Sequence, residues 1–232
     1  MRTMVRMLAL GLAVGGFVAA TAQAPAKKGW IDAFGVDKKD FVSVGANDYF
    51  RLEPGYVLTL EKGKVRLVIT VLDETKTVDG VETRIVEERE SKNGQLVEVS
   101  RNYFAFHTAD RGVYYFGEEV DIYKDGKIVR HEGAWESGKN GARFGLMVPG
   151  RPEVGARFYQ EIAPGVAMDR ARIVSVNASI RTPAGEFKGC LEFVETTPLE
   201  PLARDTKIYA PGIGLVKDGS LLLVEHGRRE EK

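Results

Sequence analysis

Cysteine is almost missing from this chain of 232 residues, which contains only Cys190. A single cysteine cannot form a disulfide within the chain, so a disulfide framework is excluded. We expect Cys190 to fill a sheet face as a small apolar side chain. Stability must then come from an apolar core and from backbone hydrogen bonds.

Net charge is missing as well, because 33 basic residues balance 33 acidic ones. The two signs are interspersed along the chain, whereas a nucleic-acid-binding surface needs clustered positive charge that replaces counterions at the phosphates. We therefore predict no nucleic-acid partner. Nothing in the composition favours one oligomeric state over another.

Motifs of common enzyme chemistry are not found in the sequence. There is no Gly-x-Ser-x-Gly elbow, no phosphate-binding glycine loop and no dinucleotide fingerprint. The three histidines, His107, His131 and His226, lie far apart and lack the short spacing of metal ligands. We predict no cofactor and no metal site built on histidine.

Long apolar runs are absent except near the N-terminus. Residues 7–20 form an uncharged apolar run that follows two arginines and precedes small residues at the spacing a signal peptidase accepts. The run is shorter than the roughly 20 residues that a membrane-spanning helix needs. We predict a signal peptide over 1–22, cut after Ala22 because the next candidate bond involves Pro25. No cysteine lies nearby to carry a lipid, so we expect a soluble exported protein, periplasmic or extracellular, without a membrane anchor.

Helical periodicity is scarce, and only residues 30–39 are a plausible short helix. Turn signals, by contrast, recur at the intervals of antiparallel strands, and most place a glycine after Asn or Asp. These turn pairs are Lys62-Gly63, Asp79-Gly80, Asn93-Gly94, Asp125-Gly126, Asn140-Gly141, Ala184-Gly185 and Asp218-Gly219. The segments between them are rich in Val, Ile, Tyr, Phe and Thr, which favours strands.

The pattern predicts an all-β protein with little helix, formed by a single strongly curved antiparallel sheet of about ten strands. A barrel, a half-barrel and a sandwich all fit the pattern. We assign residues 23–46 to an N-terminal extension, 47–226 to one β domain and 227–232 to a charged tail. The segment 64–72 is apolar on both faces near its end, so we expect a central strand there.

Several long motifs resemble a family of uncharacterised secreted bacterial proteins. They are NDYFRLEPGY (47–56), VLDETKTVDGV (71–81), VYYFGEEV (113–120), EGAWESG (132–138) and YAPGIGLVK (209–217). The resemblance implies an antiparallel β fold and export, and it carries no activity to this chain. Members usually show Asp-Trp-Tyr where this chain has Arg101-Asn102-Tyr103, and an Asp-x-x-Gly-Asn turn where this chain has Ala109-Asp110-Arg111-Gly112. If that turn binds an ion in relatives, this chain lacks one ligand.

Glu118 is the first candidate for a functional acid. Strict alternation along 114–123 places it on one face with Tyr114 and Phe116, among apolar neighbours. A carboxyl group there would have a raised pKa or need a cationic partner. Alternatively, Gly117 makes a β-bulge that reverses the alternation and exposes Glu118 to water.

His131 is the second catalytic candidate. Alternation places its imidazole on one strand face with Trp135. A histidine on a strand is also common as a structural or surface residue.

Glu161 and Asp169 are weak candidates for a metal site. They flank a Pro-Gly turn that could bring the two carboxylates together around a hard cation such as Ca²⁺. The alternative is a solvated turn in which Glu161 pairs with a neighbouring arginine.

The favoured function is a non-enzymatic binding module for a small apolar or amphipathic ligand held on the concave face of the sheet. Its expected ligand-binding residues are aromatic side chains interspersed through the strands, namely Tyr103, Tyr115, Phe116, Trp135 and Tyr159. A hydrolase or lyase that uses Glu118 and His131 as an acid and base pair is the alternative from another class. A third hypothesis is an assembly or accessory protein that acts through exposed edge strands.

Overall fold

The structure is a computed structural model that describes residues 29–228. The predicted signal peptide over 1–22 lies outside the described residues, as do the last residues of the predicted tail. The elements are η1 (Lys38–Asp40), β1 (Phe41–Val42), β2 (Tyr56–Lys62), β3 (Val65–Val78), β4 (Val81–Lys92), β5 (Gln95–His107), β6 (Val113–Lys124), β7 (Lys127–Glu136), β8 (Arg143–Val148), β9 (Arg157–Tyr159), β10 (Glu161–Ile162), β11 (Arg170–Thr182), β12 (Gly185–Thr197), β13 (Glu200–Ala210), β14 (Gly214–Asp218) and β15 (Leu221–Arg228).

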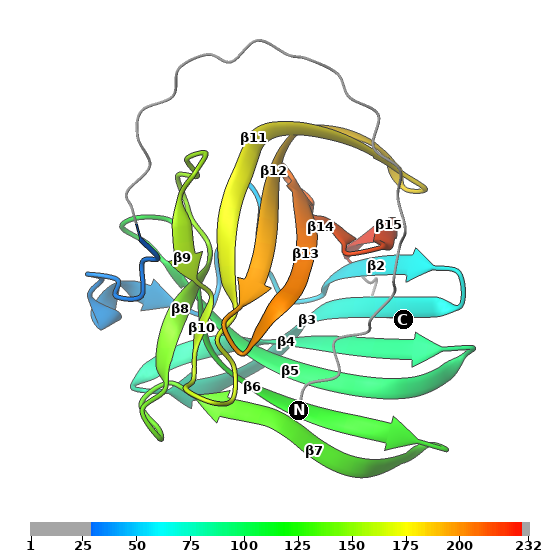
Figure 1. The fold of residues 1–232 in the computed structure, drawn as a ribbon, viewed down its shortest axis with the longest axis horizontal. Coiled ribbons are helices and arrows are strands. Elements are labelled where there is room, and N and C mark those ends of the chain that lie inside the picture. The colour runs from blue at the N-terminus through cyan, green and yellow to red at the C-terminus, as the bar shows by residue number, and fades with distance from the viewer. Residues whose placement is uncertain (1–28, 229–232) are drawn as a thin grey trace.

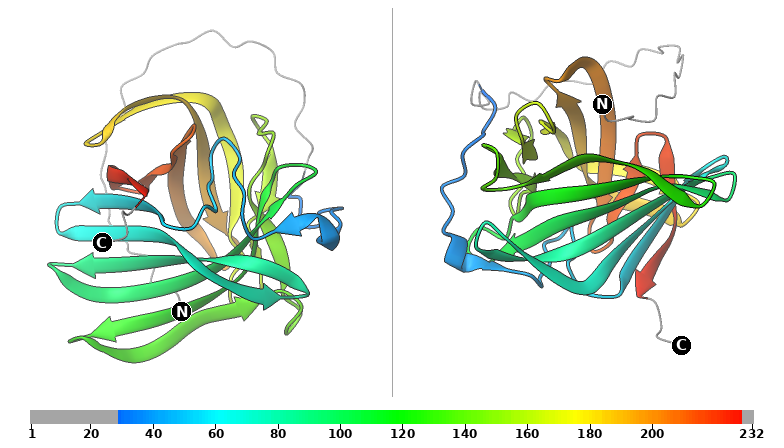
Figure 2. Two further views of the ribbon diagram at one scale, coloured as in Figure 1. Left: turned by 180° about the vertical axis from the view of Figure 1, so that it is seen from behind. Right: turned by 90° about the horizontal axis from the view of Figure 1, so that it is seen from below.

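One antiparallel sheet contains all fifteen strands, so the predicted all-β fold is confirmed, with more strands than the sequence suggested. Their order is β10-β8-β6-β5-β4-β3-β2-β15-β14-β13-β12-β11-β9, with β1 beside β5 and β7 beside β6. The sheet curls into a nearly closed barrel (Figures 1 and 2), because its end strands β10 and β9 are separated in the chain only by Gln160. A Cβ on Gly145 of β8 would lie 2.4 Å from the Gln160 carbonyl oxygen, so only glycine fits at this seam.

Short-range turn chemistry produces the long hairpins. Asp79, Asn93 and Asp125 each adopt a positive φ and are followed by a glycine with positive φ, as a type I′ turn requires. The expected central position of the strand over 64–72 is confirmed, because β3 pairs with β2 on one side and β4 on the other. The tips of the β2–β3, β4–β5, β6–β7 and β14–β15 hairpins lie at one end of the sheet, which we call the hairpin end (right in Figure 1).

The main hydrophobic core fills the concave side of the sheet. It brings together buried residues from both walls of the barrel, among them Leu60, Ile69, Phe193 and Leu223. Cys190 is fully buried in this core, as expected for a small apolar side chain. Burial raises the pKa of its thiol, which keeps it in the unreactive neutral form.

A second core lies on the outer, convex side of the sheet. Phe41 of β1 packs there against Tyr103, Tyr114 and Phe116 from β5 and β6. Phe34 joins this cluster through an edge contact with Tyr114 at 5.6 Å. The packing of Phe34 and Phe41 explains why the predicted helix over 30–39 does not form, since this segment runs extended across the sheet and only η1 is helical.

Candidate functional site

The concave side of the barrel contains an apolar cavity of about 60 Å³ that both walls line. Its apolar lining includes Leu58 and Ile69 on β2 and β3, and Phe104 on β5. Tyr209 on β13 closes it from the opposite wall. We call this cavity the lumen.

Charged side chains close the lumen on the side that faces the hairpin end. Glu88 of β4 and Lys207 of β13 both line the cavity, and Arg51 lines it as well. The Lys207 Nζ lies 3.3 Å from Glu195 Oε2 and 3.7 Å from Asp218 Oδ2. Gln160, at the seam of the barrel, donates a hydrogen bond of 2.9 Å to Glu195 Oε1.

The charges of this group shift one another's pKa values. Burial alone would lower the pKa of Lys207, but the carboxylates of Asp218 and Glu195 raise it well above its usual value. Burial raises the pKa of Glu195, and the charge of Lys207 offsets part of that rise. Tyr209 lies beside them, and its pKa is raised mainly by burial. Lys207 therefore remains charged throughout the physiological range of pH.

Two further carboxylates extend the group toward the hairpin end. Glu90 and Glu98 are directly paired across β4 and β5, so like charges face each other. Burial and the charges of Glu98 and Asp218 raise the pKa of Glu90, while Lys92 opposes the rise. We call Glu88, Glu90, Glu98, Glu195, Asp218 and Lys207 the lumen cluster. It contains five carboxylates and one lysine.

An aromatic row runs from the lumen across the concave face. Phe50 contacts Phe104 at 5.2 Å, Phe104 stacks on Tyr115 at 4.6 Å and Tyr115 meets Trp135 edge-on at 5.3 Å. The hydroxyl of Tyr115 donates a hydrogen bond to the Asn102 side chain, which fixes the ring. Two of the five expected ligand-binding residues, Tyr115 and Trp135, therefore lie on the concave face.

The other three expected ligand-binding residues lie elsewhere. Tyr103 and Phe116 belong to the outer core, across the sheet from Tyr115. Tyr159 is outside the barrel, where the Arg170 guanidinium lies 4.3 Å from the ring centre of Trp30 and 6.0 Å from that of Tyr159. The five aromatic residues do not form one surface.

A β-bulge explains why strict alternation misplaced part of this set. Tyr103 pairs with Gly117 and Phe104 pairs with Tyr115, so Phe116 has no partner on β5. The bulge that the sequence suggested at Gly117 is present, yet Glu118 stays buried with 6% of its surface exposed. The extra residue moves Tyr115 to the concave face beside Glu118 and leaves Phe116 outside.

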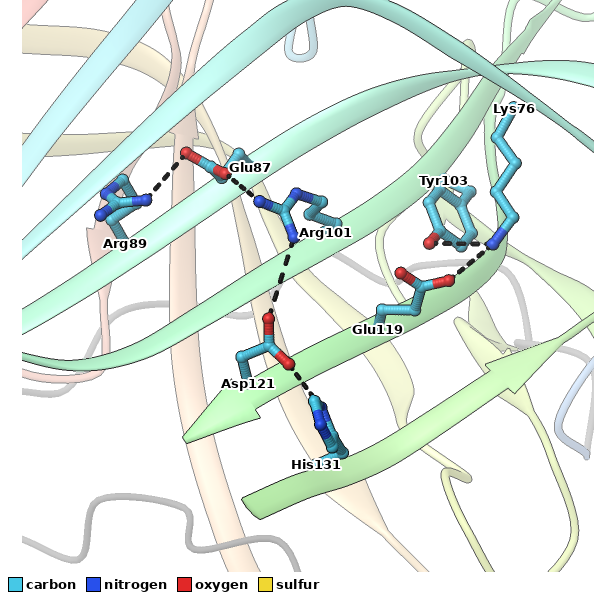
Figure 3. A network of polar contacts seen from close by, with 8 residues as sticks. All are labelled: Lys76, Glu87, Arg89, Arg101, Tyr103, Glu119, Asp121 and His131. Carbon is cyan, nitrogen blue, oxygen red and sulfur yellow. Dashed lines mark hydrogen bonds and ion pairs between the residues drawn. The ribbon is translucent and has the colours of Figure 1, made fainter. Parts of the chain in front are cut away.

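Glu118 and His131 lie on opposite faces of the sheet. Glu118 pairs with Trp135 on the concave side, whereas His131 is exposed outside and its Nδ1 lies 2.6 Å from Asp121 Oδ1 (Figure 3). A second bulge, at Gly133, separates His131 from Trp135 on β7. Glu118 and His131 are therefore not placed to act together as an acid and base pair.

The turn at Pro164-Gly165 forms as predicted, with Ala163 and Ala167 paired across it. Glu161 is buried and accepts a hydrogen bond of 3.1 Å from the Trp135 indole, so the expectation that water surrounds this side chain is wrong. The Asp169 backbone carbonyl accepts the N–H groups of Gln160 and Glu161. Within residues 29–228, no group of three or more His, Cys, Asp or Glu side chains is arranged to hold a metal ion.

Sequence reasoning missed the lumen cluster. Lys207 on β13 and Asp218 on β14 stand in strands of mixed composition, and their neighbours in space, Glu88 and Glu195, are more than ten residues away in the sequence. The only signal was a charged residue at an inward position of an otherwise apolar strand, as with Glu195 two residues after Phe193.

Comparisons with known proteins give no further assignment. In the part of the chain that the structure describes, no helix has the length and apolar character that would let it cross a membrane. No family model, no curated protein and no solved structure matches the chain. The resemblance to a secreted bacterial family therefore stays a prediction from the motifs.

Proposed function

We propose that this protein is a non-enzymatic binding module whose lumen takes a small amphipathic molecule with a cationic head group. The observation that carries the proposal is the junction of an apolar cavity with the lumen cluster. An amphipathic ligand needs both surfaces at once, and here Leu58 and Phe104 supply one while Glu88 supplies the other.

The orientation of the ligand follows from the position of the charges. The apolar part would lie against Leu58, Ile69 and Phe104, and the head group would point past Glu88 toward the hairpin end. The cavity of about 60 Å³ encloses only a few methylene groups, since a water molecule alone occupies about 30 Å³ in the liquid, so the rest of an alkyl chain would extend past Glu88 toward the hairpin end. Short chains should therefore bind better than long ones.

The sign of the head group follows from the composition of the cluster. Lys207 pairs with Glu195 and Asp218, and burial and nearby like charges raise the pKa of Glu90, so a cation near Glu90 and Asp218 would lower their mutual repulsion, whereas an anion would increase it. Converging carboxylates also raise the local concentration of cations at the hairpin end. If the predicted signal peptide is correct, the ligand is met outside the cytoplasm.

The test compares three ligands of equal chain length by isothermal titration calorimetry of the protein without residues 1–22. We expect hexylammonium to bind saturably, hexanol to bind about tenfold more weakly, and hexanoate to bind more weakly still, because a charge-assisted contact contributes about 1.5 kcal/mol or more. Equal binding of hexanoate and hexylammonium, or no binding of any of the three, would overturn the proposal.

Neighbouring residues on β4 provide a matched pair of variants. Glu88 lines the lumen, whereas Glu87 faces outward and pairs with Arg101 at 3.1 Å. Glu88→Gln should weaken hexylammonium binding about tenfold, and Glu87→Gln should leave it unchanged. Thermal unfolding of both variants verifies that they are folded. Equal effects of the two substitutions would contradict a lumen site.

A further inference from the structure

The lumen has a second polar boundary at the end away from the hairpin tips. Glu88 pairs with Ile69, and Ile69 pairs with Leu58, so these three residues form one row across β4, β3 and β2. Tyr56 lies two residues before Leu58, on the side away from the β2–β3 tip, and it also lines the cavity. The Arg51 guanidinium lies 5.2 Å from the centre of the Tyr56 ring. Glu88 and Arg51 therefore line opposite ends of the lumen.

Backbone contacts hold Arg51 at this end. Its Nη1 donates a hydrogen bond of 3.0 Å to the carbonyl oxygen of Gly212, in the turn between β13 and β14. The Tyr56 hydroxyl donates one of 2.9 Å to the Ile213 carbonyl in the same turn. The Gly212 N–H donates one of 2.7 Å to the Asp48 carbonyl. The loop before β2 and the turn after β13 are thus tied together, which restricts the position of the Arg51 side chain.

One donor of Arg51 is buried and unused. Within residues 29–228, its Nε has no hydrogen-bond acceptor and almost no exposed surface. Glu53 Oε2 lies 3.7 Å from this nitrogen, too far for a hydrogen bond, and Arg228 Nη2 lies 3.7 Å from the same oxygen. A buried donor without an acceptor destabilises the folded protein. A ligand atom that accepts this hydrogen bond would therefore bind favourably.

The charge of Arg51 is already balanced in part, which decides what kind of acceptor fits. Glu53 places a carboxylate beside the guanidinium, so a carboxylate on a ligand would be repelled by it. A neutral oxygen atom, as in an ether or a carbonyl group, accepts a hydrogen bond without adding charge. Phe50 and Ile213 line the cavity as well, and they would contact the carbon atoms around such an oxygen.

We propose that the lumen selects short ammonium compounds that carry a neutral oxygen acceptor at the end opposite the ammonium group. The oxygen would accept a hydrogen bond from Arg51 Nε, while the ammonium group points past Glu88 toward the hairpin end. The inference rests on the proposed function, because it assigns the far end of the same ligand. Arg51 is then a residue that determines specificity, since hydrogen bonds from a charged donor are stronger than those between neutral groups.

Two ligands of equal size test the inference. 4-Methoxybutylammonium differs from hexylammonium only in an oxygen atom that replaces one methylene group. In a purely apolar cavity the ether would bind more weakly, because its oxygen would lose hydration without a partner. With Arg51 as donor, we expect the ether to bind about three- to tenfold more tightly than hexylammonium in isothermal titration calorimetry of the protein without residues 1–22.

The outcomes separate this inference from the proposed function. Saturable binding of hexylammonium together with equal or weaker binding of the ether would overturn the inference alone. Failure of both ammonium compounds to bind would overturn the proposed function and the inference with it. This comparison uses the wild-type protein, so it does not depend on the folding of any variant.

The two arginines beside Glu53 provide matched variants. Arg51→Met removes the Nε donor and keeps an apolar stem, so the preference for the ether should reverse, with the ratio of the two affinities changing at least about tenfold. Arg228→Met removes the other arginine near Glu53 and should leave the ratio unchanged, because Arg228 does not line the lumen. Loss of folded protein would lower the binding of both ligands and leave their ratio as it is. An unchanged ratio in folded Arg51→Met would contradict the role of Arg51.

Discussion

Glu87 and Glu88 are neighbours on β4, yet they belong to two opposite kinds of polar network. On the outer face, Glu87 contacts Arg101 at 3.1 Å and Arg89 at 3.4 Å, and Arg101 reaches Asp121 at 3.9 Å (Figure 3). We call this set, with His131 at its end, the outer network. On the inner face, Glu88 belongs to the lumen cluster, where Lys207 pairs with Glu195 and Asp218.

The two faces differ in how their charges are balanced and in what these charges contribute to stability. In the outer network cations alternate with carboxylates, and its side chains are partly exposed, so each pair adds little to stability. In the lumen cluster the carboxylates are partly buried and outnumber the lysine, and burial raises the pKa of Glu90 and of Glu195. The outer network is therefore balanced in charge, whereas the lumen cluster holds the carboxylates on which the proposed cation site depends.

Removing the central cation of each network should give the largest contrast. Lys207→Met leaves Glu195 and Asp218 facing each other without a cation, and we expect a loss of about 2–3 kcal/mol in the free energy of unfolding, less than for a fully buried pair because a quarter of the lysine is exposed. Arg101→Met should cost less than about 1 kcal/mol. Urea denaturation measures both.

The same pair of variants has an internal control. If the Lys207→Met loss comes from repulsion among the carboxylates, adding Glu195→Gln should recover part of it. If Lys207→Met lowers the free energy of unfolding no more than Arg101→Met does, the two networks do not differ in their contribution to stability.

The pH dependence of stability should differ in direction between the faces. The raised pKa values of Glu90 and Glu195 mean that the folded state takes up protons first, so the free energy of unfolding should rise as the pH falls from 7 toward the usual glutamate value of 4.5. The lowered pKa values of Glu119 and Glu136 act below that range, where stability is lost on further acidification. Stability should therefore be greatest in mildly acidic solution.

Substitutions on each face separate the two contributions. Glu90→Gln should raise the melting temperature at pH 7 by about 1–3 °C and flatten the rise between pH 7 and 4.5, with little effect at lower pH. Glu119→Gln, from the outer side, should leave that rise in place and reduce the loss below pH 4.5. A melting temperature for Glu90→Gln below that of the wild type at pH 7 would show that the charge of Glu90 does not destabilise the folded protein.

Some features of the sheet could be predicted from the sequence, and others could not. Asp79 and Asn93 mark hairpins because turn chemistry is local, and the alternation along β3 needs no knowledge of its partners. The bulges at Phe116 and Gly133 depend on which residues of neighbouring strands face them, so the faces of Tyr115 and His131 were assigned wrongly. Local sequence patterns therefore predict strands and turns, whereas a single bulge residue determines which side chains of a strand face the concave side of the sheet.

The lumen cluster could not be predicted from local sequence patterns, for a different reason. Lys207 meets Glu88 only because the sheet closes, and the closure depends on the seam at Gln160 and Gly145. Glu118 and Trp135 were both candidates from the sequence, and the structure brings them together beside a cavity of about 220 Å³, where the Trp135 indole donates a hydrogen bond to Glu161. Their shared cavity could not be foreseen, because it needs the hairpin near Pro164.

Salt should give the smallest of these effects and sharpen the contrast further. A double-mutant cycle on Arg101 and Glu87 should yield a coupling of about 0.5 kcal/mol at low salt that vanishes at about 1 M NaCl, where the Debye length falls to about 3 Å. A cycle on Lys207 and Glu195 should keep most of its coupling, because salt ions screen partly buried pairs less. Potassium fluoride serves as a control for specific effects of chloride. Equal loss of coupling in the two cycles would mean that the lumen is as open to salt as the outer face, and that the lumen carboxylates attract cations no more strongly than surface ones.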